Sequence, residues 1–188
     1  VVTETLVGLV IGLLMLMPIA SVQLAGLMMG QQMGLALADV IDPTMEGQTE
    51  LIGQALSFIA FAAYLAAGGL EAAFAGVLYS FDAAPVGAVV LGEAPLEILV
   101  AMLASGYELA LRIAAPVLCI IFVETVAMAF VMKTVPQLNV LSVGFPIKIM
   151  AGVTVLTASI VFINEAIQPD VHASIETAVY WAASLGSR

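Results

Sequence analysis

Charged side chains that interrupt long apolar stretches are the residues of this sequence best placed to do chemistry. Glu108, Arg112 and Glu124 lie in one apolar run, and Lys148 lies near the start of the next. Ionisable groups within apolar helices are costly and often mark ion or proton pathways. Glu108 and Arg112 are one helical turn apart, so a local ion pair is the simpler interpretation. The more specific alternative is a proton or ion pathway through Glu108, Glu124 and Lys148.

Catalytic sequence patterns are absent. The sequence contains no HExxH, no GxSxG and no phosphate-binding loop. The single histidine, His172, lies in a polar tail, where a solvated side chain is the expected role. The single cysteine, Cys119, lies in an apolar run and is expected to be a small buried residue. The sequence therefore predicts neither an enzyme nor a cofactor or metal site.

The composition indicates a membrane protein. Of the 188 residues, 63% are hydrophobic and 10% are charged, whereas soluble domains are about half apolar and about a quarter charged. One core cannot hide this much apolar surface, so much of it must face lipid or other apolar helices. The apolar stretches are continuous rather than alternating, which argues against a barrel. We predict an all-α, multi-pass helical membrane protein with kinked helices, forming a single domain over residues 1–188.

The net charge limits the partners of the protein. It is −10, from 14 acidic and 4 basic residues, so no basic patch exists to neutralise the phosphates of a nucleic acid. A polybasic lipid-binding segment is absent as well. Lys133 and Lys148 flank the loop between the last two apolar runs, and the positive-inside rule places this loop in the cytoplasm.

Four apolar runs are the elements that must position these residues. They cover residues 6–29, 51–70, 96–132 and 147–163. A hydrocarbon core needs about 20 residues of helix, so the first run can cross it, with a kink expected at Pro18. The third run is too long for one straight span, and we expect a break near Pro116. In the tail that follows, apolar residues have helical spacing, and Trp181 suits a membrane interface.

Glycines in the first run favour close helix packing. Gly26, Gly30 and Gly34 are four residues apart, so on a helix they form one smooth face that another backbone can approach. Gly8 and Gly12 form a second, shorter example. Because glycine carries no reactive group, this pattern indicates assembly rather than chemistry.

An unusual stretch, residues 136–148, lies between the last two apolar runs. It has two prolines, a glycine and hydrogen-bonding side chains that can satisfy carbonyls left unpaired by the prolines. We predict a rigid helical hairpin turn here, with a C-terminal hairpin built around it. The characteristic residues are Pro136, Gln137, Leu138, Asn139, Gly144, Phe145, Pro146 and Lys148.

This stretch resembles the signature of the FliR family, the flagellar type III export-gate subunit, which is related to the virulence SctT proteins. Residues 7–12 resemble the family's third hydrophobic segment, and residues 26–34 followed by Asp42-Pro43 resemble its next segment and loop. Residues 85–87 match a short loop motif of the family. Family members usually carry two more hydrophobic segments before this point, so we expect the chain to lack them.

The resemblance implies a function. Such a subunit forms an export gate with FliP-like and FliQ-like membrane subunits, next to an FlhB-like switch protein. Unfolded flagellar proteins pass through this gate across the bacterial inner membrane at the flagellar basal body. The FliQ-like partners carry a hairpin similar to residues 127–152, which implies side-by-side stacking. A loop over residues 35–48 matches the region that plugs the closed pore, and its notable residues are Leu35, Leu37, Asp42, Pro43 and Gly47.

A small-solute or ion transporter is the alternative function. Transporters place polar groups at broken helices near the middle of the membrane. Glu108, Arg112 and Glu124 are the residues that could serve such a site.

Overall fold

The computed structural model describes residues 2–35, 48–83, 94–135 and 140–184, and all structural statements concern these residues. They form helices and no strands, which confirms the all-α prediction. The helices are α1 (Val2–Gln32), α3 (Gln48–Ala66), α4 (Gly69–Ala83), α5 (Ala94–Thr134), α6 (Val140–Ala158) and α7 (Ile160–Ser184).

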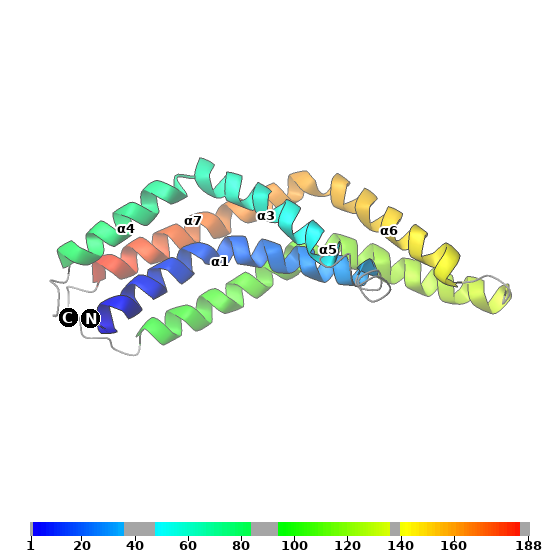
Figure 1. Cartoon of the computed structure of the whole chain (residues 1–188), viewed down its shortest axis with the longest axis horizontal. Coiled ribbons are helices and arrows are strands. Elements are labelled where there is room, and N and C mark those ends of the chain that lie inside the picture. Colours follow the sequence, from blue (N-terminus) through cyan, green and yellow to red (C-terminus); the bar gives the residue numbers. More distant parts are fainter. Residues whose placement is uncertain (1, 36–47, 84–93, 136–139, 185–188) are drawn as a thin grey trace.

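Helix α1 is the central element of the bundle. It packs against α3, α5 and α7, while α4 packs mainly against α7. Helices α5 and α6 lie against each other as the C-terminal hairpin, which extends beyond the end of α1 (Figure 1). Helix α1 begins and α7 ends at the same end of the molecule (Figure 1).

The length and composition of the helices fit a membrane. The segments Glu4–Gln32 and Leu96–Thr134 are each long and apolar enough to cross one, and two bent helix pairs raise the number of candidate spans to as many as 4. Helix α5 has 41 residues and is therefore about 60 Å long, about twice the thickness of a hydrocarbon core. Only 22% of its most apolar window is buried inside the chain. The rest of α5 must be covered by lipid or by other protein.

Five threonine hydroxyls are satisfied within the helices that carry them. In each case the side chain donates a hydrogen bond of 2.7–2.8 Å to the carbonyl four residues earlier. The residues are Thr125, Thr134, Thr154, Thr157 and Thr177. Since lipid offers no hydrogen-bond partners, this arrangement makes the helices compatible with an apolar surrounding.

Two breaks bend the helices sharply. The pair α3–α4 is bent by 63° and the pair α6–α7 by 58°. At the first break Gly68 has φ +79, the left-handed conformation that commonly ends a helix. The Tyr64 hydroxyl donates a hydrogen bond of 3.1 Å to the Gly69 carbonyl, and the Tyr64 ring lies against the space where a Gly69 side chain would be. This break therefore has a fixed local geometry.

The expected break near Pro116 is wrong. Helix α5 continues from Ala94 to Thr134 with Pro116 inside it. A proline in a helix interior removes one backbone hydrogen bond, at position 116 itself, and crowds the carbonyl of Arg112. Helix-compatible apolar residues on both sides maintain the hydrogen-bond ladder, so a local adjustment suffices.

Two side chains in the structure are placed differently from the prediction. Trp181 is only 6% exposed and belongs to the core, rather than to a membrane interface. The reason is that the tail continues as α7, whose apolar face packs against α1 and α4. Cys119, expected to be buried, is exposed on α5, because the periodicity of a helix that is apolar all round does not identify its inner side.

The break at Gly68 gives a first testable prediction. Gly68→Ala would add a methyl group with no atom within 4 Å, so the substitution tests the backbone conformation alone. We expect a loss of about 1 kcal/mol in stability, because a left-handed φ is strained for alanine. Gly12→Ala, on the exposed side of α1 with equally open space, is the control and should be neutral or slightly stabilising. Thermal unfolding in mild detergent measures both, and equal melting temperatures would contradict the prediction.

Candidate functional site

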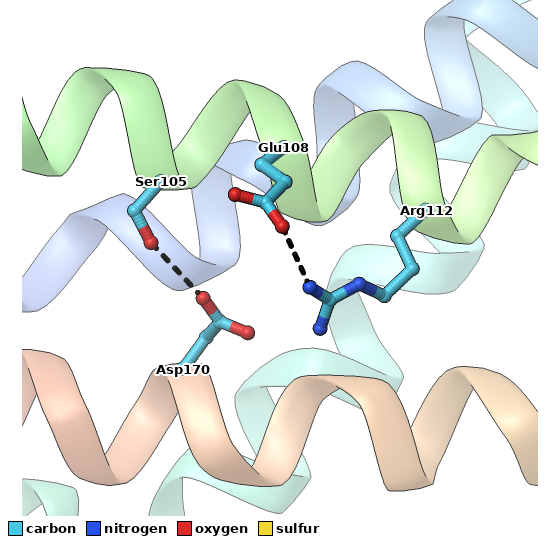
Figure 2. Close-up of polar contacts among 4 residues, drawn as sticks. All are labelled: Ser105, Glu108, Arg112 and Asp170. Carbon is cyan, nitrogen blue, oxygen red and sulfur yellow. Dashed lines mark hydrogen bonds and ion pairs between the residues drawn. The ribbon is translucent and has the colours of Figure 1, made fainter.

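A cluster of polar side chains joins α5 to α7. Ser105, Glu108 and Arg112 lie on one stripe of α5, and Asp170 faces them from α7 (Figure 2). Arg112 Nη2 donates a hydrogen bond of 2.8 Å to Glu108 Oε1 and forms an ion pair with it. Ser105 Oγ donates a hydrogen bond of 3.2 Å to Asp170 Oδ1. The cluster therefore combines one ion pair with one interhelical hydrogen bond.

A small cavity lies behind this cluster, where α1, α5 and α7 meet. Its volume is about 20 Å³, and its polar lining comes from Ser21, Ser105, Asp170 and Ser174. Ser21 Oγ lies so close to α5 that a methyl group added to Gly106 would be 2.6 Å from it. A cavity of this size holds about one water molecule. It is far below the roughly 300 Å³ of a typical small-molecule pocket.

The other charged residues singled out in the sequence lie elsewhere. Glu124 is half-buried on α5, 12 residues beyond Arg112, which is about 18 Å along the helix. Lys148 is half-buried on α6. Among the residues that the structure describes, no group of three or more His, Cys, Asp or Glu side chains could hold a metal ion. The structure therefore brings Glu108 and Arg112 together and leaves Glu124 apart.

Sequence reasoning missed Ser105 and Asp170. Ser105 could have been found, because it lies three residues before Glu108 on the same stripe of a helix. Asp170 carried no such signal, since it is 65 residues from Ser105 and lies in a tail that reads simply as polar.

The glycine face of α1 packs inside the chain. A methyl group added to Gly26 would lie 2.6 Å from the backbone nitrogen of Gly53, so α1 and α3 cross at backbone contact. Gly30, one helical turn further along α1, is also buried. By contrast, Gly8 and Gly12 have no atom within 4 Å of an added methyl group. Gly26 and Gly30 therefore lie inside the bundle, whereas Gly8 and Gly12 face open space outside it.

The hairpin signature contacts the end of α1. Gly34 has φ +84, and a methyl group added to it would lie 2.9 Å from the ring of Phe145 on α6. Met33, the residue before Gly34, packs against Gly152 of α6, where an added methyl group would lie 2.9 Å from the Met33 sulfur. Helix α6 therefore packs closely against the C-terminal end of α1.

The remaining predicted residues are distributed as follows. Gly144 is buried, while Leu35 is half-buried after Gly34. Pro146 lies inside α6 and is exposed. The rest of the predicted hairpin turn and pore plug lies outside the described residues, namely Pro136, Gln137, Leu138, Asn139, Leu37, Asp42, Pro43 and Gly47.

Comparison with known proteins identifies the family. The profile of the family described as Bacterial export proteins, family 1, matches residues 1–173 of the chain. The chain belongs to this family. The resemblance to the FliR family seen in the sequence is thereby confirmed.

Relatives of the chain carry flagellar and translocation names. The chain is 35% identical over 165 residues to the flagellar biosynthetic protein FliR of Bacillus subtilis, which covers 85% of the chain and 64% of the relative. It is 24% identical over 157 residues to FliR of Escherichia coli, covering 84% and 60%. To the Yop proteins translocation protein T of Yersinia pestis it is 24% identical over 147 residues, covering 77% and 56%. The chain therefore spans about three fifths of the length of these relatives.

Proposed function

We propose that this protein is a structural subunit of the type III protein export gate of the flagellum. It assembles with FliP-like and FliQ-like membrane subunits, next to an FlhB-like switch protein, at the basal body in the bacterial inner membrane. Unfolded flagellar proteins cross the membrane through the channel that this assembly forms. The observation that carries the proposal is the family match over residues 1–173. The higher identity to a flagellar relative than to a virulence relative supports the flagellar assignment.

The exposed apolar surface supports assembly with other helices. On the hairpin, Phe122, Phe130 and Met150 are each 70% exposed, and Phe162 at the start of α7 is 69% exposed. Large exposed apolar surfaces need lipid or a protein partner. A FliQ-like hairpin stacked beside α5 and α6 would cover this surface with a similar shape.

The mechanism that we propose is mechanical and requires no cofactor or catalytic residue. The segment 35–48 closes the pore in the resting state and yields to a substrate polypeptide. Opening follows from differential contacts of substrates or partners with the open and closed states. The contact between the Phe145 ring and Gly34 supports this proposal, because it fixes the position of the residue that precedes the segment.

Transport of a small solute, the alternative function, has less support. A transporter needs a site that encloses its solute, whereas the cavity behind the polar cluster measures about 20 Å³. Glu124 lies away from that cluster, so the three charged residues do not converge on one site. Family membership also favours protein export.

Purification from the native membrane tests the proposed function. Expressed by itself, the protein should be degraded or heterogeneous, because its apolar surface lacks partners. Co-expressed with FliP-like and FliQ-like subunits, it should be recovered in a complex of defined mass by native mass spectrometry. A stable, monodisperse protein purified without these subunits would contradict the proposal.

A further inference from the structure

The polar cluster between α5 and α7 borders apolar surface on α5 and α1. Glu108 and Arg112 side chains are 72% and 54% exposed, respectively. Tyr107 and Leu111 lie next to these two residues along α5, and they are 59% and 51% exposed. On α1, Leu16, next to the Met17 that lines the shared cavity, is 54% exposed. The cluster therefore forms a narrow polar edge beside the apolar surfaces of α5 and α1.

This polar edge is poorly suited to lipid. Charged groups in an apolar surrounding are expensive unless they meet opposite charges, hydrogen-bond partners or water. The pair Glu108–Arg112 neutralises itself, but Asp170 is bonded to the neutral hydroxyl of Ser105. Two carboxylates and one guanidinium leave one negative charge in excess. The complementary group is a cation.

Small side chains next to the charges leave room for a helix. Exposed small residues continue the polar stripe of α5, one helical turn before or after its members, namely Ala101, Ala104 and Ala115. Small residues allow two helix backbones to approach closely within membranes. Ser105 and Asp170 both line the cavity, and they come from different helices. An approaching side chain can therefore reach Asp170 without displacing a bulky group.

From these observations we propose that the polar edge is a contact site for a transmembrane helix of another subunit, which brings a lysine or arginine side chain to Asp170. The inference rests on the proposed assembly of this protein with other membrane subunits. It adds the position of one contact and the chemistry of the partner. The bound cation would balance the excess charge and exclude lipid from the Glu108–Arg112 pair.

Charge reversal at Asp170 tests the contact. In co-expressed complexes, Asp170→Lys should reduce the recovered partner subunits by about tenfold or more, and Asp170→Asn should reduce them less. Glu165→Lys is the matched control, because Glu165 is exposed on α7 and lies about 140° around the helix from Asp170. It should leave recovery near that of the unsubstituted protein. Equal recovery with Asp170→Lys would overturn the inference.

Crosslinking tests the same contact in a protein whose charges are unchanged. A photoreactive amino acid at position 101 should form an adduct with another subunit in the assembled complex. A cysteine at position 101, in a Cys119→Ser background, should react slowly with a charged thiol reagent. Adducts with lipid only, or reaction as fast as that of a cysteine in an aqueous loop, would overturn the inference.

The outcomes also separate this inference from the proposed function. If no membrane subunit is recovered with the unsubstituted protein, the proposed function fails. If subunits are recovered equally well with Asp170→Lys, only the contact at the polar edge fails.

Discussion

Gly26→Leu is expected to separate α1 from α3 and to destabilise the protein by about 3 kcal/mol or more. The new side chain would overlap the backbone of Gly53. Its Cβ alone would lie 2.6 Å from the Gly53 nitrogen. A flexible side chain could move aside, but a helix backbone cannot do so without shifting the whole of α3. Since α1 also packs against α5 and α7, the displacement would spread through the bundle.

Thermal unfolding in mild detergent measures this effect. A loss of 3 kcal/mol corresponds to a fall in Tm of about 6–12 °C for a protein of this size. Gly12→Leu is the control, because it places the same side chain on the same helix with no atom within 4 Å of the added Cβ. If Gly26→Leu unfolds at the temperature of the control, α1 and α3 do not meet at Gly26.

Trp181→Ala is expected to cost about 3–5 kcal/mol, the range for removing a large buried aromatic side chain. Trp181 is 6% exposed, and its neighbours in the core from α7 include Ala178 and Ala182, both fully buried. These alanines cannot fill the space that the indole leaves. A cavity would therefore remain at the end of the bundle where α7 finishes.

Tyr180→Ala is the matched control for this second prediction. Tyr180 precedes Trp181 on α7 but is 75% exposed, so its removal should change the stability by less than about 1 kcal/mol. The amount of folded protein that resists limited proteolysis at increasing temperature distinguishes the two variants. Similar resistance would place Trp181 at the surface, where the sequence had suggested a membrane interface.

Several features of the fold followed directly from the order of residues. Four long apolar runs and a nearly continuous apolar composition required helices in or beside lipid. The break between α3 and α4 falls at a Gly-Gly pair, because glycine readily adopts the left-handed φ that ends α3. The absence of catalytic motifs and the stretch 136–148 led to the export family, which the profile match then established.

The sequence could not decide which side of each helix faces inward. In a helix that is apolar all round, hydrophobic periodicity does not point to the core. For this reason the exposed position of Cys119 and the buried position of Trp181 were not predicted. The continuity of α5 through Pro116 was missed as well, since the effect of a proline depends on whether the surrounding helix can absorb it.

By itself, the sequence determined that this is a helical membrane protein of the export family, because composition, run length and local motifs are properties of the chain in order. Only the tertiary structure decided which residues meet. Gly26 lies against Gly53, Gly34 lies against Phe145, and Ser105 donates to Asp170 from 65 residues away. Such contacts depend on how whole helices cross and rotate, which the summed packing of many side chains fixes and no single segment encodes.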